Sequence, residues 1–170
     1  MSISMYDASV PTFQQILSCQ SAILDKAKAH TEAKNIEPSV LINARLYPDM
    51  LPFKKQIQIL TDLANRGAAR LAGLELPSNP DTEETFDELK ARITKTLAFV
   101  KSVKPEQMAG SENKAYEIPV GGDKKMSMSG QQYLFHFVLP NLIFHATTAY
   151  GILRHSGVEL GKKDFLQPPD

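Results

Sequence analysis

Apolar residues recur at helical spacing in four separate segments of this chain, and no other feature constrains its fold as strongly. At about 100° per residue, the apolar side chains of each segment fall on one face of a helix. The four stripes are Tyr6, Val10, Phe13, Leu17, Leu24 and Ala27; Phe53, Ile57, Leu60, Ala64, Ala68 and Leu71; Phe86, Leu89, Ile93, Leu97 and Val100; and Leu142, Ala149, Ile152 and Leu153. Four amphipathic helices without an internal repeat predict an all-α four-helix bundle.

Loop-forming residues indicate where these helices end. The expected helices run up to a break at residues 34–38, from about 49 to 73, from near 81 or 82 to just before 104, and from about 129 to 155. Pro52 suits the first turn of the second helix, and Gly73 suits its C-terminal cap. Pro140 lies inside the fourth helix, where it should kink the helix or leave a carbonyl unpaired.

A short segment between the third and fourth helices has a different period. Tyr116, Ile118 and Val120 alternate with other residues, as do Met126 and Met128, and 121–123 is a Gly-Gly-Asp turn sequence. This pattern predicts a short β-hairpin before the last helix. The whole chain, residues 1–170, is therefore expected to form one domain.

Composition narrows the classes of partner. Nineteen basic residues balance nineteen acidic ones without long runs of either sign, which argues against nucleic acid or an anionic membrane as a partner. Cys19 is the sole cysteine, no stretch has the length and apolarity of a membrane span, and the N-terminal residues do not resemble a signal peptide. We therefore expect a cytoplasmic protein. Neither a complete phosphate-binding loop nor a G-x-S-x-G serine motif occurs.

Three of the four histidines lie in the last helix, but their spacing does not favour a metal site. One helix presents two ligands to one ion when they are three or four residues apart. His136 and His145 are nine residues apart, so they lie roughly 180° apart around the helix. His145 and His155 are ten apart, roughly 80° around the helix and some 15 Å along it. The position four after His145 is Ala149, which has no donor atom.

His145 shares its helix face with apolar residues, which leaves two interpretations. It is either a buried, hydrogen-bonded core histidine or a pocket histidine that acts as a general base or a lone ligand. Candidate partners are Gln56 and Asp49 on the second helix and Gln20 on the first. Asp49 is most simply explained as an N-cap, whereas a glutamine beside a core stripe needs hydrogen-bond partners. These four residues are the predicted pocket.

Several longer motifs together resemble one protein family. They are Arg45-Leu46-Tyr47-Pro48-Asp49-Met50 with Gln56, Leu139-Pro140-Asn141 with Phe144-His145, and Tyr150 with Leu153-Arg154-His155-Ser156-Gly157 and Gly161-Lys162-Lys163-Asp164-Phe165. The chain resembles an uncharacterised bacterial family known only as a domain of unknown function. That family is placed among the DinB/YfiT-like four-helix bundles, a superfamily classed with metalloenzymes. The resemblance implies an up-down-down-up bundle and a homodimer.

The superfamily also carries a three-histidine metal site, and this chain departs from it. One ligand comes from the second helix and an H-x-x-x-H pair comes from the last. By resemblance His145 matches the first member of that pair, but Ala149 occupies the second position and the second helix contains no histidine. We therefore expect no bound metal, with zinc or nickel at His145 as the alternative.

Three functional hypotheses remain open from the sequence. The first is a homodimeric bundle whose degenerate metal site binds a small molecule without catalysis. The second is a transferase or hydrolase acting on a small molecule, either through a metal held by Asp49, Gln56 and His145 or through His145 as a base. The third is a partner-binding module that uses Met126 and Met128 of the hairpin, because methionine-rich surfaces adapt to partners.

Overall fold

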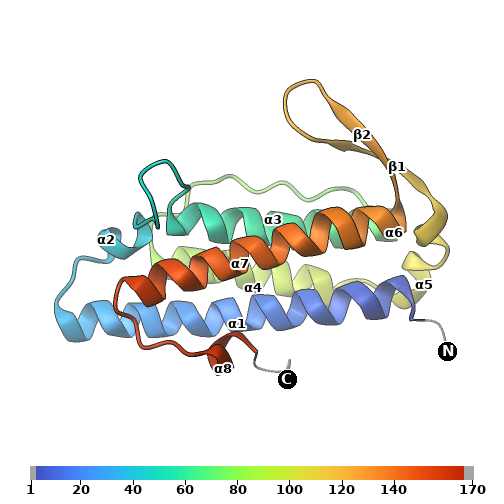
Figure 1. The fold of residues 1–170 in the computed structure, drawn as a ribbon. Coiled ribbons are helices and arrows are strands. Elements are labelled where there is room, and N and C mark those ends of the chain that lie inside the picture. The colour runs from blue at the N-terminus through green and yellow to red at the C-terminus, as the bar shows by residue number, and fades with distance from the viewer. Residues whose placement is uncertain (1–2, 167–170) are drawn as a thin grey trace.

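A computed structural model describes residues 3–166 and contains four long helices (Figure 1). They are α1 (Met5–Lys34), α3 (Phe53–Ala72), α4 (Phe86–Ser102) and a continuous last helix made of α6 (Gly130–Gln132), the π-helical turn η2 (Tyr133–Val138) and α7 (Leu139–His155). In Figure 1, α1 and α7 run in one direction while α3 and α4 run in the other. The predicted up-down-down-up four-helix bundle is confirmed.

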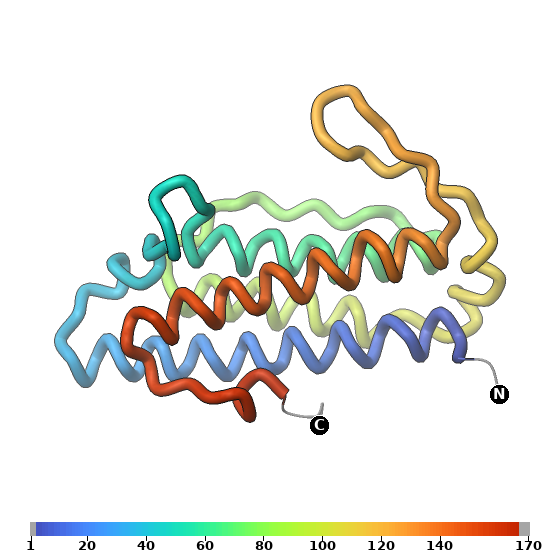
Figure 2. Tube along the Cα trace, in the orientation of Figure 1, coloured from blue at the N-terminus to red at the C-terminus, as the bar shows by residue number. Residues whose placement is uncertain are grey.

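The smaller elements lie in the connections. They are α2 (Pro38–Ile42), α5 (Pro105–Met108), the short η1 (Ser111–Asn113), strands β1 (Ala115–Pro119) and β2 (Lys125–Ser129), and α8 (Lys162–Phe165). The chain also crosses the length of the bundle between α3 and α4 as an extended segment, residues 74–85, which we call the strap; the trace in Figure 2 shows it passing alongside α3.

The core lies where the four predicted stripes meet. Helix α3 packs chiefly against α7, and α1 packs chiefly against α4. The predicted stripe residues are buried with two exceptions, Tyr6 and Leu97, which are only partly buried. Each leucine-sized side chain that is removed from water contributes about 1.5–3 kcal/mol, so this shared core dominates the stability of the bundle.

Two predicted helix starts are wrong. Helix α3 begins at Phe53 with Pro52 in the N-cap position, and Asp49 instead lies exposed in a turn before it. Asp49 is therefore not the N-cap. Helix α4 begins at Phe86, because Thr85 forms a capping box with Glu88 and stops the helix from extending back to 81 or 82. The predicted cap Gly73 is confirmed, with φ of 68°.

A buried arginine of α4 holds the strap against the bundle. The Arg92 guanidinium donates to Asp62 at 2.8 Å, to Glu83 and Asp81 at 3.1 Å, and to the Pro80 carbonyl at 3.2 Å. It also donates to the Thr61 hydroxyl at 2.7 Å. Asp81 and Glu83 of the strap, which resemble the acidic first turn of a helix, thus form ion pairs with Arg92, about ten residues further along the chain.

The predicted hairpin is confirmed and projects from one end of the bundle (Figure 1). Its strands pair antiparallel, with Ile118 opposite Met126. Ile118 is buried and Met126 is exposed, while Met128 packs partly against the core. Of the two methionines, Met126 is therefore the one available to the hypothesised partner surface.

The predicted irregularity at Pro140 takes the form of an altered helical turn. The turn before it widens into π-helix, in which the Leu139 N–H donates to the Leu134 carbonyl five residues earlier. In addition, the Asn141 side chain donates to the Phe137 carbonyl at 2.7 Å. A π-turn relieves the clash between the proline ring and the preceding turn, so the last helix continues through the proline.

The C-terminal segment docks back onto α1. Asp164 accepts from Lys26 at 2.7 Å and from the Gly161 N–H at 2.8 Å, and the Phe165 ring meets Tyr150 edge to face. Phe165 therefore anchors this segment, whereas Leu166 is exposed.

Candidate functional site

The candidate site centres on a hydrogen bond between α7 and the first turn of α3. His145 Nδ1 lies 2.7 Å from Gln56 Oε1. Gln56 is buried, and its Nε2 donates to the Leu51 carbonyl at 2.9 Å. The side chains meet because α3 and α7 are adjacent antiparallel helices, so the start of one lies beside the later part of the other. The structure thus brings together two of the four predicted pocket residues.

These two contacts fix the tautomer of the imidazole. Because Gln56 donates its amide N–H to the Leu51 carbonyl, its Oε1 is the atom that faces His145. A carbonyl oxygen only accepts, so His145 Nδ1 must carry the proton. The lone pair of a neutral His145 is then on Nε2, and the ring is held in one orientation by a partner on another helix.

Burial keeps this imidazole neutral. The ring is half-buried, and desolvation lowers the pKa of His145 below its ordinary value of 6.5. Charging the ring would place a cation beside the apolar core, which is unfavourable without a carboxylate partner. At neutral pH the site therefore offers a fixed hydrogen-bond acceptor and base.

Apolar side chains frame the imidazole on the surface. The Phe144 ring meets it edge to face, with centroids 5.2 Å apart, and is itself exposed. The loop before α3 adds exposed Leu51 and Leu46, and Leu46 approaches α7 at Gly151. The surface near the imidazole thus combines one polar acceptor with exposed apolar side chains.

Gln20 lies deeper, on the core side of α7. It is fully buried and donates to the Ala146 carbonyl at 3.3 Å. Its Oε1 has no hydrogen-bond partner among the residues that the structure describes. A buried amide oxygen without a partner costs about 1–3 kcal/mol, so this atom marks a place where a water or ligand group would be stabilised.

Asp49 lies apart from this hydrogen-bonded pair. It is exposed in the loop between α2 and α3. The Arg45 side chain organises that loop by donating to the Met50 carbonyl at 3.0 Å and the Pro48 carbonyl at 3.3 Å. No hydrogen bond or ion pair within residues 3–166 joins Asp49 to His145 or Gln56.

The donor set does not fit the metal site of the superfamily. Ala149 is fully buried in the core, and Gln56 turns its oxygen to the protonated nitrogen of His145. Across the described part of the chain, no group of three or more His, Cys, Asp and Glu side chains is placed to hold a metal ion. His145 Nε2 is the single histidine donor at this position, so we derive no chemistry through a metal here.

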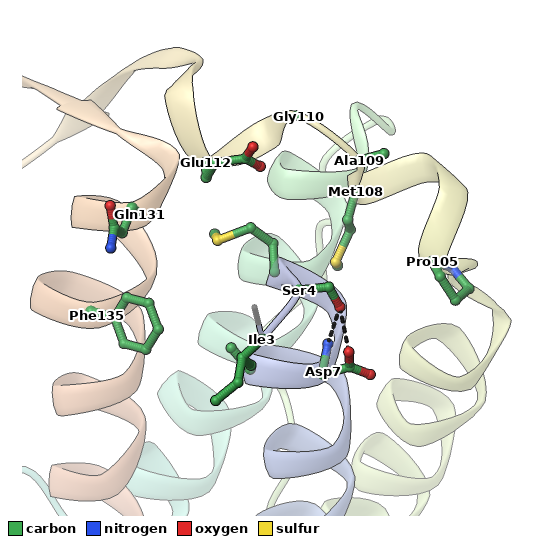
Figure 3. Close-up of a pocket in the computed structure, with 12 residues that line it drawn as sticks. Ile3, Ser4, Asp7, Pro105, Met108, Ala109, Gly110, Glu112, Gln131 and Phe135 are labelled. Atoms are coloured by element: carbon green, nitrogen blue, oxygen red, sulfur yellow. Dashed lines mark hydrogen bonds between the residues drawn. The ribbon is translucent and has the colours of Figure 1, made fainter. Parts of the chain in front are cut away.

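A separate cavity lies at the end of the bundle where α1 begins (Figure 3). Its volume is about 810 Å³, and its walls come from the start of α1, from α5 and from the last helix. The carboxylate of Asp7 is already engaged by the Ser4 hydroxyl at 2.6 Å. Phe135, one of the residues that line this cavity, lies roughly 15 Å along the last helix from His145. The cavity is therefore separate from the histidine site.

The sequence pattern missed one contributor to the site. The Leu51 carbonyl orients Gln56, but it is a backbone atom and no side-chain motif identifies it. The sequence does mark this position through Pro52, which follows Leu51, ends the loop and immediately precedes the first residue of α3.

The fold and this site define a DinB-like four-helix bundle. The chain is similar to a solved protein whose structure is described as a DinB family member from Shewanella denitrificans. The two share 39% sequence identity with a TM-score of 0.89, over 96% of this chain and 92% of that one.

The chain belongs to the family described as a domain of unknown function (DUF1993), whose model matches residues 5–166. No curated protein matches the chain. Among the described residues, no helix has the length and apolarity needed to cross a membrane.

Proposed function

We propose that this protein is a cytoplasmic homodimer that binds a small molecule at the His145–Gln56 pair without using a metal. The observation that carries the proposal is the hydrogen-bond chain from His145 Nδ1 through Gln56 to the Leu51 carbonyl. This chain holds a neutral imidazole whose Nε2 lone pair is left for a ligand. The ligand would be a small molecule that donates a hydroxyl or amide hydrogen to Nε2 and lays an apolar part against Phe144 and Leu51.

The proposal that the protein is a dimer rests on the outer face of the last helix. Phe135, Ile143 and Phe144 of this helix are all exposed, although other side chains of the same helix lie in the core. A helix that is apolar on both faces is usually covered on both. A second copy that packs its last helix against Ile143 would bury exposed apolar surface by one symmetric contact.

Metal analysis and ligand binding test the site together. We expect protein purified without chelator to contain far less than one equivalent of zinc, nickel or manganese. An NMR screen of a fragment library should identify a fragment that shifts the His145 ring signals, and His145→Gln should abolish binding of that fragment, followed on the signals of the fragment itself. His155→Gln is the matched control, because His155 is an exposed histidine near the end of the same helix. Stoichiometric metal that is lost on His145→Gln would overturn the metal-free proposal.

A second candidate is a histidine-based transferase or hydrolase. It is favoured by the same fixed tautomer, because a neutral imidazole with an open Nε2 can remove a proton from a bound substrate. Turnover of any ligand found above would distinguish catalysis from binding. The turnover rate should fall when the pH drops below the lowered pKa of His145, because the base is then protonated. The rate should vanish in His145→Gln. Binding of a ligand without turnover would contradict the enzyme proposal and support the binding proposal.

Light scattering tests the dimer. Ile143→Glu should convert the dimer to a monomer, because it places a charge at the centre of the proposed contact. Val40→Glu on α2 is the control, since Val40 is at least as exposed but lies away from the last helix. A monomeric wild-type protein at micromolar concentration would refute the dimer and leave the ligand proposal standing.

A further inference from the structure

A second cavity, distinct from the histidine site, lies between the strap and the outer face of α3. Its volume is about 490 Å³, within the range of roughly 300–1,000 Å³ for small-molecule sites. Arg70 lines it fourteen residues after Gln56, which places the two roughly 20 Å apart along α3. We call it the strap cavity, because Leu76, Pro77 and Ser78 of the strap form one of its walls.

The strap cavity contains one uncompensated positive charge. Two arginines line it, Arg66 and Arg70. Arg66 pairs with Asp62 at 3.3 Å, and Asp62 is also held by Arg92 at 2.8 Å. Within the described residues, no carboxylate lies within ion-pair distance of Arg70, which is half-buried. A half-buried cation without a counter-ion favours an anionic ligand.

An aromatic hydroxyl lies beside this charge. The Arg70 guanidinium lies over the Tyr133 ring, 5.3 Å from its centroid. Burial raises the pKa of Tyr133, and the nearby Arg70 only partly offsets this effect. The hydroxyl therefore stays protonated at neutral pH and is available as a donor.

The remaining walls are apolar. Ile59 and Leu63 contribute from α3, and buried Ile118 contributes from the hairpin. Tyr133 and Phe137 come from the π-helical turn, where their rings stack with centroids 5.9 Å apart. The turn that accommodates Pro140 thus also places two aromatic rings together in the cavity wall, and π-turns often occur at functional sites.

We propose that the strap cavity binds a small organic monoanion with an apolar body, such as a medium-chain carboxylate. The carboxylate would accept hydrogen bonds from the Arg70 guanidinium and the Tyr133 hydroxyl, and the hydrocarbon would lie against Ile59, Leu63 and Phe137. A carboxylate carries one negative charge, which matches the one uncompensated arginine. A phosphate monoester carries about 1.5 to 2 negative charges at neutral pH and would leave charge unpaired.

Calorimetry with octanoate on the full-length protein tests the proposal. We expect saturable binding with a dissociation constant below about 1 mM, together with a change in tyrosine fluorescence. The chain has five tyrosines and no tryptophan, so that emission is observable. Octanol should bind at least tenfold more weakly, because it lacks the charge that Arg70 would pair with. Equal binding of octanol and octanoate, or no saturation with octanoate, would overturn the proposal.

Three variants assign the binding to this cavity. Arg70→Met should lower octanoate affinity by roughly tenfold or more, since it removes a charge-assisted hydrogen bond but keeps the side-chain stem. Arg154→Met, on the exposed end of the last helix, should leave affinity unchanged. Ser78→Phe fills the cavity from the exposed strap and should abolish binding while leaving the helical signal in circular dichroism intact. Equal losses in Arg70→Met and Arg154→Met would show non-specific attraction and refute the site.

Discussion

Replacing Arg92 with methionine should destabilise the protein through the strap. The Arg92 side chain is only 3% exposed, and its carboxylate partners are 13% exposed at Glu83, 21% at Asp62 and 43% at Asp81. Removing one partner of a fully buried ion pair costs about 3–5 kcal/mol. Because Asp81 is solvated, and Asp62 and Glu83 keep contacts to Arg66 and Gln58, we expect the low end, about 3 kcal/mol.

A chemical-denaturation series measures this loss. For a chain of this size, about 3 kcal/mol corresponds to a fall in Tm of about 6–12 °C. Arg92→Lys should lose less than Arg92→Met, because it keeps the charge but loses the planar fork. Lys90→Met is the control: the Lys90–Asp25 pair is exposed on both sides and contributes about 0.5 kcal/mol. If Arg92→Met costs no more than Lys90→Met, then the strap network does not stabilise the fold and the reasoning fails.

Three further outcomes follow from single positions. Gly130→Ala should cost about 3 kcal/mol in urea denaturation, because its Cβ would lie 2.0 Å from the Ser111 carbonyl oxygen. Gly151→Ala should be neutral or slightly stabilising, because its Cβ would make only an ordinary van der Waals contact with Leu46 at 3.8 Å. Burial lowers the folded pKa of His145 below 6.5, so the unfolded state binds more protons there. Wild-type stability should therefore fall as pH drops through 6.5 towards that folded pKa, and His145→Gln should remove this part of the slope. Gln56→Glu should raise the pKa of His145 in an NMR titration, because it places a carboxylate against Nδ1; an unchanged pKa would argue against the contact.

The sequence predicts those parts of the fold that depend on local patterns. Helical stripes, the alternating hairpin and Gly73 each act within one segment, so periodicity and turn chemistry identify them. The start of α4 is not predicted correctly by local patterns, because Asp81 and Glu83 resemble an acidic first turn. Their partner Arg92 lies about ten residues away on another element. The assignment of Asp49 as an N-cap is wrong for a similar reason, since Pro52 and the Arg45 contacts determine the path of the loop.

Local patterns predict the residues of the candidate site but not their pairing. His145 and Gln56 were identified because each is a polar residue beside an apolar stripe, and such residues need partners. Their pairing depends on the relative height of two helices, which no local pattern gives. The π-turn before Pro140 also changes the phase of the helix, so the faces assigned to residues before it, including His136, could not be extrapolated from those after it.

The core also explains why a single substitution would not restore the three-histidine arrangement of the superfamily. Ala149, which by resemblance takes the place of the second ligand, has no exposed surface and belongs to the buried face of α7. A histidine there would add a polar ring to a close-packed interior at about 1–3 kcal/mol, before any ligand geometry is gained. A ligand from α3 would also be needed, and Gln56, the α3 side chain that contacts His145, already makes two hydrogen bonds that hold the imidazole and the Leu51 loop. The histidine site of this chain is therefore packed as a hydrogen-bonded pair, and its chemistry should be sought in the Nε2 lone pair of a neutral imidazole.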